Sequence, residues 1–378
     1  FFFSSRRRHT RCSGVSWARR CVRDRPYLIF PDLIEQPTWG GNYIVNLKKL
    51  KNPAFNNKKI GQSYELYSKS KLLTNIKDPR TPQLLSPLKK DRDYFILEEK
   101  INSPLKILIK LTQALGNSFQ LHTKPQNQNS RWQSKAETWF FLKDGLATLG
   151  IKPQCNLQQY QRVCLEIEAQ MQKLSQNIQQ KIISLTLAKQ TAANLIKKLN
   201  PWQFVNLVKI KKNQVVDLSA CGIHHSWEEN AQVIPEGNIV YEIQQDVADE
   251  ISSIRSFDKG KFKNDGTIRP IHINDYFANL DIKLENNSPS NLIKTLRGEN
   301  IIANKYYYLD ILNLNKNRSF KNKNLFHHLF VSEGEIEICA QKEKLILPQG
   351  FSCFIPQAVT HYTLICRQPK TIVLKSYI

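Results

Sequence analysis

Gln120 and His122 stand two positions apart in FQLHT (119–123), a short segment with the composition of a β-strand. Residues i and i+2 of a strand face the same side, so both side chains would point the same way. A carboxylate, Glu137, follows in a second strand-like segment, and the pair His224 and His225 lies well downstream. Two imidazoles, a carboxylate and an amide oxygen suit zinc or a similar divalent ion and leave positions for water or substrate. These residue types and their spacing predict a metal site.

Short strands would have to position this site. LKILIKL (105–111) is apolar at alternate positions, and the segments at 204–210, 213–219 and 238–245 also have strand composition. A further strand-rich region runs from 306 to 378. Closely spaced strands without alternating helices indicate a barrel or a sandwich and argue against a parallel α/β sheet.

One region has a different pattern. Between 157 and 182, apolar residues recur every three or four positions, which predicts a helical region over 156–200. Asn156 is a candidate cap at its start, and Asn200-Pro201 ends it because proline restricts the residue before it. One long helix and two packed helices both fit this pattern. The polar stretch LENNSPSN (284–291) reads as a linker.

The 378-residue chain carries a net charge of +23, to which an arginine-rich N-terminal segment contributes. We interpret residues 1–25 as a non-native basic tail, because three Phe and a basic run replace the order of charge and apolar stretch found in a signal peptide. The remaining lysines are dispersed, without a basic-aromatic motif, so we expect no nucleic-acid partner. No apolar run is long enough for a membrane helix, and no membrane partner is expected. Without CxxC spacing, the cysteines read as reduced thiols of a cytoplasmic protein.

A series of motifs, in order along residues 27–280, resembles type I mannose-6-phosphate isomerases of the cupin superfamily. A W-G-G turn, an I-G-E-like segment and an L-I-K-L strand are followed by Q-x-H, K-x-E-x-W and H-containing motifs, and then by E-I-Q-Q, R-x-F-D and R-x-I-H-I. They lie at 35–41, 60–65, 108–111, 119–122, 135–140, 219–225, 242–245, 254–258 and 269–273. A single block would be weak support, whereas the ordered set is specific.

The resemblance implies a mainly β fold: a metal-binding cupin barrel at 26–155 and 201–283, a helical insertion at 156–200 and a degenerate second cupin at 284–378. It implies isomerisation of mannose 6-phosphate to fructose 6-phosphate through a cis-enediol, with one Zn²⁺ or other divalent ion per chain. A sugar phosphate would be the substrate; the sequence does not indicate an oligomeric state. The metal ligands would be Gln120, His122, Glu137 and His224. Arg255, Lys135 and Glu242 would be catalytic, with Glu242 a candidate base, and Lys110 and Lys261 would bind substrate.

The chain also departs from the family pattern. Cys221-Gly222 replaces Gly-Thr before the histidine pair, so His225 remains an alternative to the preferred ligand His224. Lys261 stands where many relatives have Arg. Near the C-terminus, Gly350, Pro356 and His361 resemble a second cupin motif, but the HxH pair is missing, which predicts a metal-free barrel. Because fold does not fix function, a non-catalytic sugar- or sugar-phosphate-binding cupin is the alternative.

Overall fold

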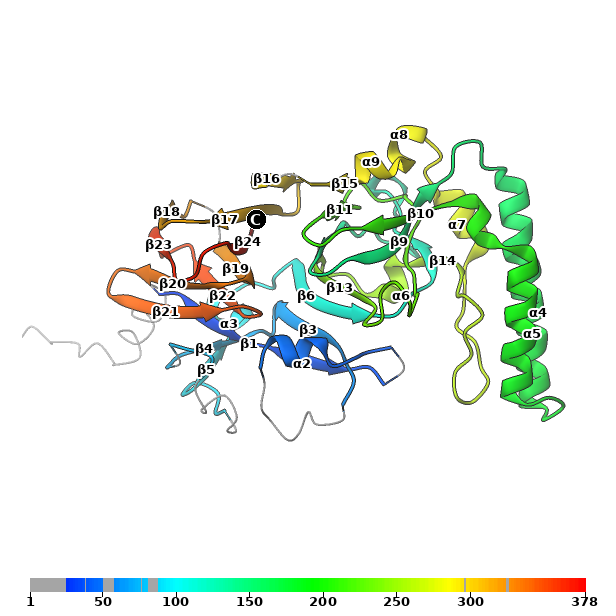
Figure 1. Cartoon of the computed structure of the whole chain (residues 1–378), viewed down its shortest axis with the longest axis horizontal. Helices are drawn as coiled ribbons and strands as arrows, with labels where there is room; N and C mark the ends of the chain where they lie inside the picture. The colour runs from blue at the N-terminus through cyan, green and yellow to red at the C-terminus, as the bar shows by residue number, and fades with distance from the viewer. Residues whose placement is uncertain are drawn as a thin grey trace, which may run out of the picture. The chain divides into compact units, whose positions relative to one another are not determined.

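The computed structural model describes residues 25–37, 39–49, 58–75, 77–80, 88–295, 297–323 and 326–378 (Figure 1). Positions 1–24 of the expected N-terminal tail, and Thr38 within the W-G-G turn motif, lie outside these residues. The chain divides into two compact units. The larger contains residues 30–71 and 96–311, and the smaller combines 72–95 and 312–378 with the segment up to Ile29.

The larger unit is built mainly from strands. They are β2 (Asp32–Glu35), β3 (Ile60–Leu66), β6 (Ile107–Ala114), β7 (Phe119–Leu121), β8 (Glu137–Phe141), β9 (Gly145–Ile151), β10 (Val205–Ile210), β11 (Val215–Asp217), β12 (His225–Trp227), β13 (Asn238–Gln245), β14 (Ile254–Phe257), β15 (Ile293–Lys294) and β16 (Gly298–Ala303). All of them except β16, which pairs with β17 (Tyr308–Leu314), form a seven-stranded sheet, β15-β11-β8-β13-β6-β3-β2, and a five-stranded sheet, β10-β9-β12-β7-β14. Between the sheets lies an apolar cluster that includes Trp139, Leu149 and Val240.

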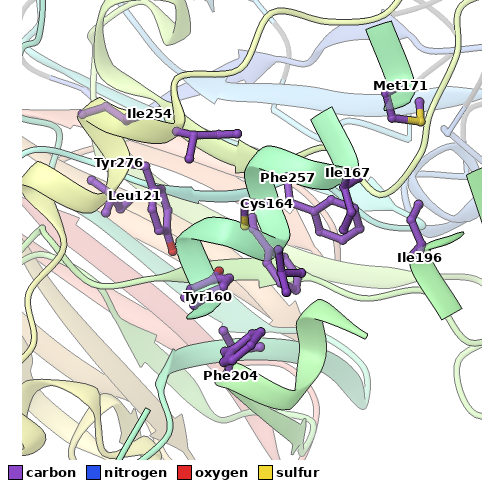
Figure 2. Close-up of a cluster of buried hydrophobic side chains, with 14 of the residues drawn as sticks. Leu121, Tyr160, Cys164, Ile167, Met171, Ile196, Phe204, Ile254, Phe257 and Tyr276 are labelled. Carbon is purple, nitrogen blue, oxygen red and sulfur yellow. The ribbon is translucent and has the colours of Figure 1, made fainter. Parts of the chain in front are cut away.

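The larger unit also contains the helices α2 (Tyr43–Leu47), α3 (Leu97–Ile101), η3 (Pro125–Asn127), α4 (Leu157–Gln179), α5 (Leu185–Leu199), η4 (Pro201–Phe204), α6 (Asp249–Ser252), α7 (Ile273–Asn279), α8 (Leu284–Asn287) and α9 (Pro289–Leu292). Of these, α4 and α7 pack on the face of the five-stranded sheet that points away from the seven-stranded sheet. The buried residues of α4 are those of the apolar stripe, and they pack with Leu121, Ile254, Phe257 and Tyr276 (Figure 2). The five-stranded sheet is therefore buried on both faces.

The smaller unit joins the beginning of the described chain to its end. Its strands are β1 (Tyr27–Phe30), β4 (Lys71–Leu73), β5 (Tyr94–Ile96), β18 (Arg318–Lys321), β19 (Phe326–Glu333), β20 (Glu335–Ala340), β21 (Glu343–Pro348), β22 (Ser352–Pro356), β23 (His361–Cys366) and β24 (Thr371–Tyr377), together with the end of β17 (Tyr308–Leu314). One sheet contains the order β17-β24-β19-β22-β1-β4-β5, and the other is β18-β23-β20-β21. In the first, Tyr27 pairs with Phe354 in antiparallel register.

The predicted mainly β fold with a helical insertion is confirmed. The insertion consists of two helices, and the Asn156 side chain accepts a hydrogen bond from the Gln159 amide at the start of α4. The linker expected at 284–291 was wrong, because α8 and α9 occupy this stretch, where buried Asn287 holds the Ile151 amide through its side-chain oxygen. The two compact units combine segments that are distant in sequence. The predicted domain boundaries stay a prediction.

Candidate metal centre and the cleft above it

A row of polar side chains crosses three strands of the five-stranded sheet. In β7, Gln120 lies directly opposite His225 of β12 on one side and Arg255 of β14 on the other. Residues directly opposite each other in antiparallel strands place their side chains on the same face. The alternating pattern of β7 sends Phe119 and Leu121 to the helical side, so this row faces the seven-stranded sheet.

The seven-stranded sheet presents a second polar row. On β13, Gln244 lies opposite Glu137 of β8, and Glu242 lies opposite Lys110 of β6. The period of two that runs along each strand places Glu242 and Gln244 on one face with Glu137 and Lys110. These positions are buried, which is unusual for carboxylates and lysines unless they are paired.

The two rows meet at His122, Glu137 and His225, whose ligand atoms all lie within 4.8 Å of one another. His122 holds its Nδ1 2.8 Å from the Ser252 carbonyl oxygen and its Nε2 3.2 Å from Glu137 Oε2. His225 likewise holds Nδ1 3.1 Å from the Ile223 carbonyl oxygen. A carbonyl accepts only from a protonated nitrogen, so each ring keeps Nε2 as the acceptor or ligand atom.

This arrangement fits a divalent cation. His225 Nε2 is buried and has no hydrogen-bond partner among the described residues, which is costly unless a ligand satisfies it. Gln120, next to His225, offers an amide oxygen that, within the described part of the chain, accepts only a 3.2 Å bond from Ser118. Two neutral imidazoles, one carboxylate and this oxygen form a donor set suited to zinc and similar ions.

The charges and burial around the cluster keep its side chains in the protonation states that bind a cation. Burial alone would raise the pKa of Glu137, but the contact with His122 and the charge of Lys135 outweigh burial and hold this pKa below its usual value. Burial, reinforced by the neighbouring His122, lowers the pKa of His225 to about 4. Glu137 is therefore an anion and His225 a neutral base near pH 7, which are the states in which both bind metals.

The expectation that His224, in preference to His225, faces the cluster was wrong. Adjacent residues of an extended segment point to opposite faces, and His225, not His224, faces Gln120. The His224 ring lies on the helical side, where its edge meets Phe119 at 4.6 Å between ring centroids and its nitrogens contact Thr148 and Tyr276. His224 is therefore a buried packing residue, and the alternative, His225, joins the cluster.

A cleft of about 580 Å³ opens above the cluster. Its lining includes every predicted catalytic and substrate-binding residue: Lys110, Lys135, Glu242, Arg255 and Lys261, and also Gln120 and Glu137. Lys110 pairs with Glu242 at 3.2 Å, and Thr112 donates to the other Glu242 oxygen at 3.1 Å. Burial raises the pKa of Glu242 to about 7, although the charge of Lys110 opposes this.

Asp249 and Lys189 are among the cleft residues that had not been predicted from the sequence. Asp249, at the start of α6, accepts a 2.8 Å hydrogen bond from Lys135, and the charge of Lys135 holds the pKa of Asp249 below its usual value despite burial. Lys189 comes from α5 in the helical insertion and lines the same cleft. Asp249 follows the E-I-Q-Q motif closely enough to have been suspected, whereas no sequence signal places Lys189 near strands so distant in the chain.

Comparisons with known proteins identify the fold. Residues 298–373 match the family model of the mannose-6-phosphate isomerase cupin domain. Mannose 6-phosphate isomerase from Bacillus subtilis is similar in structure, with 13% identity, a TM-score of 0.61 and coverage of 93% of this chain and 99% of that chain. This chain carries the cupin domain and the fold of the mannose-6-phosphate isomerase family. The predicted family and cupin fold are thereby confirmed.

Two further solved structures have the same fold. A mutant of phosphomannose isomerase from Salmonella typhimurium matches with 15% identity and a TM-score of 0.64, covering 93% of this chain and 99% of that one. A mannose 6-phosphate isomerase bound with zinc and yttrium matches with 15% identity and a TM-score of 0.62, with the same coverage. No curated protein matches the sequence. Among the described residues, no helix is long and apolar enough to cross a membrane.

Proposed function

We propose that this chain is a metal-dependent aldose–ketose isomerase that interconverts mannose 6-phosphate and fructose 6-phosphate. The observation that carries the proposal is the buried His122–Glu137–His225 cluster with Gln120 beside it, at the base of a cleft lined by acidic and basic side chains. The isomerase family of the cupin domain supports the same activity. We expect one divalent cation per chain, with zinc as the first candidate.

The reaction moves one proton between C1 and C2 of the open-chain sugar and a second between their oxygens. A cation held by Gln120, His122, Glu137 and His225 would stabilise the negative charge that develops on a sugar oxygen. Glu242 is the proposed base: as a carboxylate it accepts the C2 proton of the aldose and returns it to C1. A pKa of about 7 suits this exchange, because the group gives and takes a proton with equal ease near neutral pH.

Basic residues would bind and orient the substrate. Lys135 is held by Asp249 at 2.8 Å, and Lys110 is held by Glu242 at 3.2 Å, so both ammonium groups have fixed positions at the cleft. Arg255 donates only a 3.3 Å bond, to the Ser253 carbonyl oxygen, and its buried Nε has no partner among the described residues. We infer that Arg255 offers its remaining donors to the enediol oxygens or the phosphate.

The test is conversion of mannose 6-phosphate to fructose 6-phosphate by the purified chain, before and after exhaustive chelation and after zinc is restored. We expect activity to disappear on chelation and to return with zinc. Activity that survives complete metal removal would refute the metal's role. Binding of several hexose phosphates without any turnover would instead establish the non-catalytic sugar-binding cupin.

A further inference from the structure

The loop between β14 and α7 forms one wall of the cleft and runs beside the α4–α5 hairpin (Figure 1). Asp258, Gly260 and Lys261 line the cleft. Lys259, between them, turns away from the cleft: its side chain is only 8% exposed and lies over the Phe119 ring. The loop therefore alternates cleft-lining residues with a buried anchor that the proposed mechanism does not use.

The buried ammonium of Lys259 has three acceptors. Its Nζ lies 2.7 Å from Glu228 Oε1, and it donates to Ser226 Oγ at 2.8 Å and to the Trp227 carbonyl oxygen at 2.7 Å. Both carboxylate oxygens of Glu228 have further partners, because Oε1 accepts from Ser226 Oγ at 2.8 Å and Oε2 accepts from Trp202 Nε1 at 2.9 Å. A lysine has three donors, so this network satisfies all of them.

The backbone is shaped to deliver this anchor. Lys259 and Gly260 have φ angles of +56° and +72°, so the chain makes a left-handed turn in which only glycine is free of strain. A Cβ built on Gly260 would come within 2.6 Å of Ile196 Cδ1 of α5, so the turn is also pressed against the helical insertion. On the cleft side, Lys261 Nζ donates to the Gly116 carbonyl oxygen at 2.8 Å.

Such a pair is costly to bury. Burial lowers the pKa of Lys259 to about 8 even though Glu228 opposes the shift. Well-packed apolar residues often stabilise a fold as well as a buried ion pair does, whereas an ion pair with directed hydrogen bonds specifies one geometry. Stability alone therefore does not account for a fully hydrogen-bonded lysine directly beside the cleft wall.

We propose that Lys259 is a positioning residue: its ion pair with Glu228 ties the 258–261 turn to the end of β12 and thereby sets Lys261 to receive the anionic group of the substrate. Lys259 itself does not touch the substrate. The inference rests on the proposed function only for the identity of that substrate.

The experiment compares the wild-type chain with Lys259→Met, with the double variant Lys259→Met/Glu228→Gln, and with the control Lys209→Met. Lys209 is an exposed lysine of β10 that does not line the cleft. The double variant removes both charges and so avoids leaving Glu228 buried without a partner. For each protein, amide hydrogen exchange over 258–269, inorganic phosphate affinity, and KM and kcat for mannose 6-phosphate are measured.

We expect both Lys259 variants to exchange faster over 258–269 and to raise KM by roughly tenfold or more, since a small misplacement of a positioning group has effects up to about 10²-fold. We expect kcat to change much less and the Lys209 variant to match wild type. A double variant with wild-type loop protection and KM would overturn the proposal, even if the single variant fails to fold.

The proposal and the proposed function fail in different ways. Absence of isomerisation by the wild-type chain, with intact loop protection and phosphate affinity, refutes the proposed function alone. In that case, hydrogen exchange and phosphate affinity still decide the role of Lys259: a loss of both in the double variant supports it, and wild-type values of both refute it.

Discussion

Replacing each histidine of the adjacent pair by alanine should separate metal binding from stability. His225→Ala removes a ring whose Nε2 faces the cluster, whereas His224→Ala removes a ring packed against Phe119 on the opposite face. A large-to-small change in such a core costs about 2–5 kcal/mol, so His224→Ala should lower stability by an amount in that range. In the metal-free protein, His225→Ala should cost less, because removing an unpaired buried nitrogen offsets about 1–3 kcal/mol.

The response to metal is the sharper measurement. A free metal concentration 100-fold above the dissociation constant stabilises a binding-competent fold by about 2.7 kcal/mol. For a unit of this size, that corresponds to a rise in Tm of roughly 5–10 °C. Wild type and His224→Ala should both show the rise, the latter from a lower starting Tm, and His225→Ala should show none. Metal content after gel filtration provides an independent check.

One result would refute this reasoning about the two faces of the segment. If folded His224→Ala lost its metal and its metal-induced stabilisation while His225→Ala kept both, the assignment of the faces would be wrong. A loss by both variants would be informative only if their metal-free forms had near-native circular dichroism. That comparison is therefore made first, in the presence of chelator.

Three further predictions concern the cleft and its support. Glu242 accepts a proton only as a carboxylate, so kcat should rise with pH through its pKa of about 7. Glu242→Gln should lose most of the activity and also this rise of kcat with pH. If the rise remained in the variant, it would belong to another group. Arg255→Lys keeps the charge but loses the planar donors, so kcat should fall by roughly 10²-fold in the isomerase assay, and an unchanged kcat would exclude a role in charge stabilisation. Lys48→Met breaks a buried 2.8 Å ion pair with Glu65 outside the cleft, so the free energy of unfolding measured with denaturant should fall by about 3–5 kcal/mol while kcat is unchanged. A fall in kcat of the folded variant would mean that this pair shapes the site.

The sequence could predict features that follow from local periodicity. The apolar stripe predicted the buried face of α4, and the spacing of Gln120 and His122 predicted that both belong to the polar side of one segment. Motif order also predicted charged residues of the cleft, because Lys110, Lys135 and Arg255 all line it.

Features that depend on pairing between distant strands could not be predicted. The choice between His224 and His225 depends on strand register, and a shift by one residue exchanges the two faces. The contribution of Lys189 depends on how the helical insertion folds back beside the loop after β14. The short helices at 284–292 were missed because polar residues with proline also suit a turn, and tertiary contacts of Asn287 decide the outcome.

The pairing of β1 with β22 has a consequence for the order of folding during synthesis. Phe354, the partner of Tyr27, is made more than three hundred residues after it. The larger unit, whose described segments are complete by residue 311, is able to form its sheets while the edge of β1 that pairs with β22 is still open, although β4 on the other edge of β1 is already made. Contacts of such long sequence separation form slowly and leave strand edges open meanwhile. Premature chain termination would therefore expose this edge of β1, and the matched segment 298–373 made alone would lack β1, although it keeps β19, the other strand that pairs with β22.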